Sequence, residues 1–287
     1  MMNFLNNKFP ILIIVLILSI LFFSYYYYMR RNIKRVVVFD LDETLGCFVQ
    51  FGIFCDAIEK FYKRPLTDNE FISLLDLYPE YLRPHILSIL NYLKINKQKR
   101  ELYKVYLYTN NQGPKDWARK ICKYLEYKIN YKLFNQLIGA YKVNNRIVEP
   151  TRTTYEKTLS DFLNTTNLPN NTEICFIDDL YHDKMDHSNV LYVHLDPYTK
   201  LLPISTLANR YVKHYTVPNK SNFNQFIQDF MSRYNLNDIQ NPQFNMRHHN
   251  ANAEYLKEQL EIFLHKPDNR SRKLRIFNNK RHTFKHH

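Results

Sequence analysis

The chain has 287 residues, of which 45% are hydrophobic and 15% aromatic, so it carries enough apolar material for a buried core and is not a disordered chain by composition. Its formal net charge is +13, but five basic and no acidic residues lie in residues 1–35, and eight basic and one acidic residue lie in 266–287. The body between these ends is almost neutral, which leaves a nucleic-acid groove across the whole domain without support.

An uncharged apolar run extends from residue 9 to residue 29. A helix of this length spans about 30 Å, the thickness of the hydrocarbon core of a membrane. Tyrosines at 25–28 and four basic residues within 30–35 follow the run, an order typical of a cytosolic interface. We therefore expect a short tail at 1–8, a transmembrane anchor in the lipid bilayer at 9–29 and a basic juxtamembrane segment at 30–35, with the remaining chain in the cytosol. A cleaved signal peptide is the alternative, but bulky tyrosines occupy the place of its cleavage site.

The following residues, 36–215, alternate between segments typical of strands and segments typical of helices. Apolar or alternating patterns predict strands at 36–39, 104–108, 173–177 and 190–195. Amphipathic patterns predict helices after the capping box at 67–70, after Arg83-Pro84, after Pro114 and across 153–163. This order predicts an α/β domain with a Rossmann-like parallel sheet and a small or absent cap, in which 46–81 is a small insert.

The C-terminal part differs from the domain before it. Residues 216–265 contain two amphipathic segments, at 222–234 and 253–264, which predict helices. Residues 266–287 are basic, polar and rich in Asn, so we expect this tail to be largely disordered and suited to an anionic partner.

Polar residues follow three of the predicted strands at the point where each strand ends. They are Asp40-Leu41-Asp42-Glu43-Thr44, Thr109-Asn110-Asn111 and Asp178-Asp179. Because the carboxyl ends of parallel strands meet at one edge of a sheet, we expect these side chains to lie close together. An aspartate at a strand end can also form a turn, but that explains one acid rather than four. Four neighbouring carboxylates repel one another unless a cation compensates their charge.

In this order the clusters resemble the motifs of the haloacid dehalogenase superfamily of phosphohydrolases. The run D-L-D-E-T-L, with Arg83-Pro84 before a helix, resembles its small C-terminal-domain phosphatase group, over roughly residues 35–200. The resemblance implies Asp40 as the nucleophile, Asp42 as the general acid and base, and Thr44, Thr109 and Asn110 as substrate-binding residues. It also implies a Mg²⁺ ion held by the Asp40 carboxylate, the Asp42 backbone carbonyl and Asp178, with Asp179 close or bound through water.

The same resemblance requires a catalytic lysine between the second and the fourth motif. Lys157 is our first choice, because it lies in the helix expected across 153–163 and precedes the acidic pair. Lys142 and Arg152 are the alternatives. We interpret His182, Asp183 and His187, which follow the acidic pair, as residues of a solvated loop.

The resemblance predicts a phosphatase that hydrolyses phosphomonoesters through an aspartyl-phosphate. Because the insert at 46–81 is short, we expect an open site, which favours a phosphorylated macromolecule, first of all a phosphoprotein. Small phosphomonoesters are an alternative, and the basic tail suggests nucleic-acid ends as another. An anchored domain of this kind resembles both the Dullard-type phosphatases and a mitochondrial import receptor whose domain is catalytically degraded. A membrane-tethered binding module without turnover is therefore the rival prediction.

Overall fold

The computed structural model describes residues 8–31, 33–113, 116–234, 236 and 244–265, and in the first helix it describes side chains only from residue 13 to residue 24. Its centre is a five-stranded parallel sheet in the order β3-β2-β1-β6-β7. The strands are β1 (Arg35–Phe39), β2 (Lys104–Tyr108), β3 (Phe134–Ile138), β6 (Glu173–Asp178) and β7 (Val190–His194). The predicted α/β class and its parallel sheet are confirmed. The chain order reverses at β1, so β1 and β6 flank the switch point at which such sheets bind ligands.

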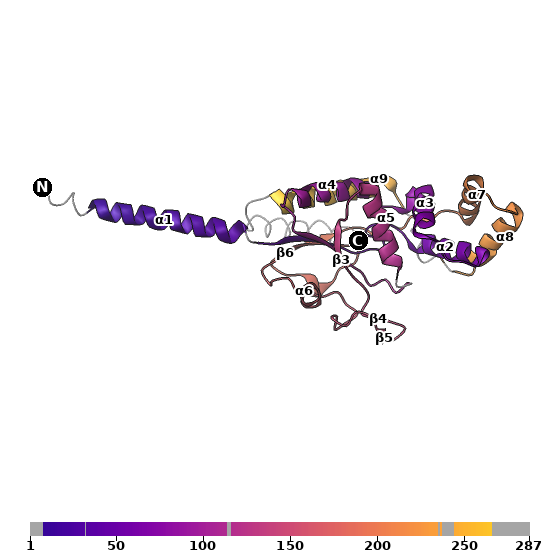
Figure 1. Cartoon of the computed structure of the whole chain (residues 1–287), viewed down its shortest axis with the longest axis horizontal. Helices are drawn as coiled ribbons and strands as arrows, with labels where there is room; N and C mark the ends of the chain where they lie inside the picture. Colours follow the sequence, from indigo (N-terminus) through magenta and orange to yellow (C-terminus); the bar gives the residue numbers. More distant parts are fainter. Residues whose placement is uncertain (1–7, 32, 114–115, 235, 237–243, 266–287) are drawn as a thin grey trace, which may run out of the picture.

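Helices cover both faces of this sheet (Figure 1). One face carries α4 (Ile86–Gln98), α5 (Trp117–Ile129) and α9 (Met246–His265), and the other carries α6 (Leu159–Thr166). Successive side chains of β1 alternate between the faces. Val37 and Phe39 enter the larger hydrophobic core, whereas Val36 and Val38 pack in a smaller core with Phe162 of α6.

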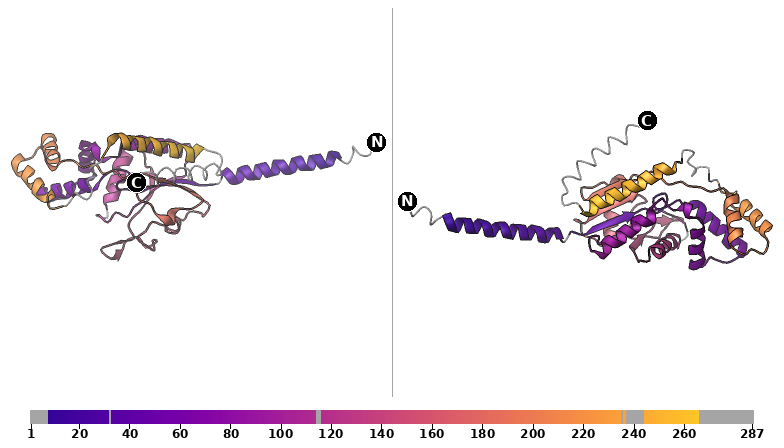
Figure 2. Two further views of the ribbon diagram at one scale, coloured as in Figure 1. Left: turned by 180° about the vertical axis from the view of Figure 1, so that it is seen from behind. Right: turned by 90° about the horizontal axis from the view of Figure 1, so that it is seen from above.

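Four more helices form a group at the end of the molecule opposite the N-terminal helix (Figure 2). They are α2 (Val49–Tyr62), α3 (Asp68–Leu77), α7 (Ile204–His214) and α8 (Lys220–Met231). The rings of Phe61 and Tyr211 lie 5.0 and 4.7 Å from the ring of Phe223, which joins α2 and α7 to α8. The segment expected as a small insert, 46–81, therefore shares its core with helices that follow the sheet.

Several predicted helix boundaries are confirmed and others are corrected. The capping box is present at α3, where Glu70 N donates to Thr67 Oγ1 and Thr67 N donates to the Glu70 carboxylate at 2.9 Å. The helix expected after Arg83-Pro84 is present as α4, which begins after His85, a residue with a left-handed φ of 60°. The helix expected across 153–163 begins only at Leu159, after its cap Thr158. Pro114, expected to open the next helix, lies outside the described residues.

A short β-hairpin follows β3 in the chain and lies outside the five-stranded sheet. It pairs β4 (Lys142–Val143) with β5 (Arg146–Ile147) in antiparallel register. The two turn residues, Asn144 and Asn145, both have positive φ, as the turn of a two-residue hairpin requires.

The N-terminal helix α1 (Lys8–Arg31) contains 24 residues and extends away from the sheet (Figure 1). Its large apolar side chains within residues 13–23 are exposed. Taken over the described residues, no helix is both long and apolar enough to cross a membrane. The basic tail expected at 266–287 lies outside the described residues.

Candidate active site

The polar clusters that follow β1, β2 and β6 meet at the carboxyl edge of the sheet. Asp40 N donates to Ile177 O at 2.9 Å, which continues the β1–β6 ladder by one residue and places Asp40 beside Asp178. Thr109 N continues the β2–β3 ladder in the same way, donating to Ile138 O at 3.0 Å. Asp40, Thr109 and Asp178 are all buried. The expected convergence of the three strand ends is therefore present.

Lys157 is the cation at the centre of this cluster. Its ammonium donates to Asp40 Oδ1 and, at 2.7 Å, to Asp178 Oδ2, and its side chain is 2% exposed. Burial lowers the pKa of Lys157, but Asp40 and Asp178 outweigh this effect and raise it above its usual value. Lys157 therefore stays charged and bridges the two carboxylates.

The position of Lys157 in the fold differs from the prediction, because the residue precedes α6 instead of lying within a helix. The two alternatives are directed elsewhere. The ammonium of Lys142 lies over the ring of Tyr141, 4.9 Å from its centre. Arg152 donates to backbone carbonyls, with its shortest contact at 2.7 Å to Gly139 O. Of the three candidates, Lys157 alone contacts Asp40.

A second contact network surrounds Asp179. Thr44 Oγ1 donates to Asp179 Oδ1 at 2.8 Å, and Asp179 N donates back to Thr44 Oγ1 at 3.1 Å. Carboxylate oxygens of Asp40, Asp178 and Asp179 all lie within 4.8 Å of one another. Burial raises the pKa of Asp179, and the nearby Asp40 carboxylate raises it further.

These residues fit a hard divalent cation. The Lys157 ammonium contacts Asp40 and Asp178, and Asp42 and Asp179 add two carboxylates nearby, so the described cluster has an excess of negative charge. Carboxylate oxygens are the ligands that Mg²⁺ prefers. Among the described residues, Asp40, Asp178 and Asp179 have carboxylates that lie close enough together to hold such an ion. The Asp42 carboxylate is not part of this group.

Asp42 is directed toward the loop after β2. Its Oδ2 accepts from Asn111 Nδ2 at 2.6 Å, whereas its Oδ1 is buried without a hydrogen bond among the described residues. Burial raises the pKa of Asp42 to about 6, although the hydrogen bond from Asn111 opposes this shift. A carboxyl group with this pKa can both donate and accept a proton near neutral pH.

The sequence placed Asn111 in the second polar cluster without a role of its own and assigned His182 to a solvated loop. The side chain of Asn110 is exposed, and the hydrogen bonds of the described residues connect Asn111 to the cluster instead: Asn111 N donates to Thr109 Oγ1 at 3.0 Å. His182 is buried, with its Nε2 3.6 Å from Asp178 Oδ2, so the prediction of a solvated loop is wrong for this residue. It holds for Asp183 and His187, which are exposed.

The loop after β1 is held in place by two unusual backbone features. Glu43 adopts a left-handed φ of 59°, and its N–H donates to Gly46 O at 2.8 Å. A Cβ atom at Gly46 would lie 2.3 Å from Tyr81 O, so no residue larger than glycine fits there without a shift of the backbone. Gly46, which directly follows the D-L-D-E-T-L run, thus allows the loop that contains Thr44 to pack against residues 79–82.

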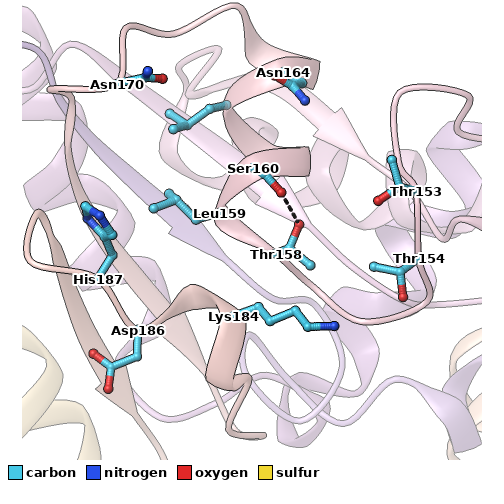
Figure 3. Close-up of a pocket in the computed structure, with 11 residues that line it drawn as sticks. Thr153, Thr154, Thr158, Leu159, Ser160, Asn164, Asn170, Lys184, Asp186 and His187 are labelled. Carbon is cyan, nitrogen blue, oxygen red and sulfur yellow. Dashed lines mark hydrogen bonds between the residues drawn. The ribbon is translucent and has the colours of Figure 1, made fainter.

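A cavity of about 700 Å³ lies beside α6 and is lined by residues at the start of that helix (Figure 3). Figure 3 shows Thr153, Thr154 and Lys184 on one side of it and His187 on the other, with Leu159 between them. None of the residues predicted for catalysis, substrate binding or metal binding lines this cavity. The cavity is therefore separate from the carboxylate cluster.

Comparison of the chain with models of known protein families, with curated proteins and with solved structures gave no match.

Proposed function

We propose that the chain is a magnesium-dependent phosphatase that hydrolyses phosphomonoesters through an aspartyl-phosphate on Asp40. The observation that carries this proposal is the contact of one buried lysine, Lys157, with both Asp40 and Asp178, beside Asp179 and at the end of β1. Asp178 Oδ1 accepts from Leu180 N at 2.9 Å, as an aspartate in a turn does, while its Oδ2 accepts from Lys157.

In the first half of the reaction an oxygen of Asp40 attacks phosphorus, and the bond between phosphorus and the leaving oxygen breaks. Asp42 donates its proton to the leaving oxygen, which its raised pKa permits. In the second half Asp42 takes a proton from the water that attacks phosphorus, and the Asp40 carboxylate is released.

Other residues bind and orient the phosphoryl group. Burial raises the pKa of Asp40 to about 6, and Lys157, which opposes this rise, favours the ionised form and places a positive charge beside the phosphoryl oxygens. The Thr109 hydroxyl accepts from Asn111 N, which leaves its own proton free to be donated to a phosphoryl oxygen. A Mg²⁺ ion held by Asp40, Asp178 and Asp179 would reduce the repulsion between the Asp40 carboxylate and the phosphate that approaches it.

We further propose a phosphoprotein as the substrate, with the chain anchored through residues 9–29 and its catalytic domain facing the cytosol. The support for the anchor lies in the sequence alone, in the uncharged run and the basic residues that follow it, since no helix among the described residues is long and apolar enough to cross a membrane. The basic tail at 266–287 would then bind an anionic partner, such as the membrane surface.

Hydrolysis of p-nitrophenyl phosphate by the full chain tests the proposed activity. We expect turnover with millimolar Mg²⁺, a loss of turnover after EDTA treatment and recovery when Mg²⁺ is restored, because the carboxylate cluster repels phosphate without a cation. A matched sample treated with EDTA already saturated with Mg²⁺ controls for nonspecific effects. Binding of a phosphopeptide without any release of phosphate would instead favour a binding module without turnover.

A further inference from the structure

Two arginines are buried beside the candidate site without a carboxylate partner. Arg83 is 1% exposed and Arg152 is 2% exposed. Among the described residues, neither guanidinium forms an ion pair, and each donates to backbone carbonyls instead. Burying an arginine is costly, and it is usually compensated by a paired carboxylate. Both residues therefore need an explanation beyond the stability of the core.

Arg83 holds the loop after β1. Its Nε donates to Thr44 O at 2.6 Å, and its Nη2 donates to Glu43 O and, at 2.7 Å, to Asp196 O. The side chain of the same Thr44 forms the hydrogen bonds with Asp179. The guanidinium thus fixes the backbone of the residue that orients one of the three clustered carboxylates.

Arg152 holds the opposite side of the site. Its Nη1 donates to Gly139 O at 2.7 Å and to Thr109 O at 3.3 Å, and its Nη2 donates to Tyr155 O at 3.0 Å. The guanidinium also lies 4.8 Å from the centre of the Tyr108 ring. It therefore connects the loop that carries Thr109 to the segment that leads into Lys157.

We propose that Arg83 and Arg152 are positioning residues with separate effects. Arg83 sets the affinity of the site for its cation, because it acts through Thr44 on Asp179. Arg152 sets the affinity for phosphate, because it contacts the carbonyl of Thr109, whose hydroxyl is the proposed donor to a phosphoryl oxygen. The role of Arg152 in phosphate affinity rests on the proposed function. The role of Arg83 in cation affinity does not require that the chain turns over a substrate.

The test compares Arg83→Lys with Arg152→Lys in the full chain. Each change keeps the positive charge but removes the planar guanidinium, whose N–H groups donate to several carbonyls at once. The dissociation constant of Mg²⁺ alone is measured by calorimetry, and that of inorganic phosphate is measured at saturating Mg²⁺. We expect Arg83→Lys to weaken Mg²⁺ binding by about 10- to 100-fold, as for other residues that orient metal ligands, and to change phosphate binding by less than about threefold. Arg152→Lys should weaken phosphate binding by about 10- to 100-fold and change Mg²⁺ binding by less than about threefold.

Two further variants keep the test decisive if a lysine variant does not fold. Thr44→Val removes the hydrogen bond to Asp179 and should reproduce the Mg²⁺ effect. Tyr108→Leu removes the ring beneath Arg152 and should reproduce the phosphate effect. Thr166→Val is the matched control, because the Thr166 hydroxyl is buried but bonds only within α6, to Phe162 O at 2.7 Å and to Leu163 O.

The measurements separate this inference from the proposed function. A wild-type chain that binds Mg²⁺ and phosphate with the expected split between the variants, yet releases no product, contradicts the phosphatase and supports the two positioning roles. If both lysine variants weaken both ligands to a similar extent, the roles are not separate and the inference is wrong. If the wild type binds no Mg²⁺ or no phosphate, the corresponding half of the inference is wrong.

Discussion

Asp40→Asn is expected to reduce kcat for p-nitrophenyl phosphate by roughly 10⁴-fold or more, the scale seen when a covalent nucleophile is removed. Asparagine has nearly the shape of aspartate, but its amide oxygen is a poor nucleophile and cannot form the acyl-phosphate. The side chain is buried at the end of β1, so the substitution preserves packing while it removes the reactive group. Steady-state kinetics measures the loss of kcat, and the thermal unfolding midpoint shows whether the packing is preserved.

Asp183→Asn is the matched control for this substitution. The same chemical change then falls on an exposed aspartate four residues beyond Asp179. We expect its kcat to stay within about threefold of the wild type, since exposed substitutions away from such clusters have small effects. An Asp40→Asn variant that is folded and keeps more than a tenth of wild-type kcat would contradict the role given to Asp40.

Lys157→Met is expected to lose both activity and stability. Methionine has a similar length but no charge, so Asp40 and Asp178 would face each other in the interior without the ammonium that now contacts both. Removing one partner of a buried ion pair costs about 3–5 kcal/mol of the free energy of unfolding. Because Mg²⁺ would replace part of the missing positive charge, it should raise the unfolding midpoint of the variant more than that of the wild type.

Lys184→Met provides the comparison for the lysine. Lys184 forms an ion pair with Glu156 at 2.8 Å, but its side chain is 61% exposed. Exposed pairs contribute less than about 1 kcal/mol, so the free energy of unfolding should change little. Denaturant titration of the two variants measures this difference. If the two variants lose the same free energy of unfolding, the Lys157 contacts stabilise the chain no more than a surface ion pair does.

The strand ends of the site were predictable because they depend on local sequence. An apolar run ends at Phe39 and another at Ile177, and the acids that follow each run lie at the same edge once the strands are parallel. Lys157 contacts Asp40, although it precedes α6 instead of lying in the helix expected across 153–163, and its catalytic role stays a prediction. Arg152 donates to Tyr155 O and Glu156 O, which a helix across 153–163 would have used as its own acceptors.

The remaining features depend on contacts between distant segments. Arg83 lies 39 residues from Thr44, and Asp196, whose carbonyl it also contacts, lies 113 residues further along the chain than Arg83. No local pattern marks an arginine that will bind carbonyls of two loops. His182 N likewise donates to the hydroxyl of Tyr192, a residue ten positions further along the chain, at 3.0 Å. The choice between Asn110 and Asn111 depends on the path of a loop, which residue type alone does not specify.

Phosphorylation of Asp40 itself is the most direct test of the proposed mechanism. The full chain is mixed with p-nitrophenyl phosphate and Mg²⁺, quenched in acid during turnover and reduced with borohydride, which converts an aspartyl-phosphate to homoserine. Peptide mass spectrometry then identifies the modified position. The mechanism predicts homoserine at position 40 in the wild type and none in the sample without Mg²⁺. Turnover with position 40 unmodified, or modification of a different residue, would contradict it.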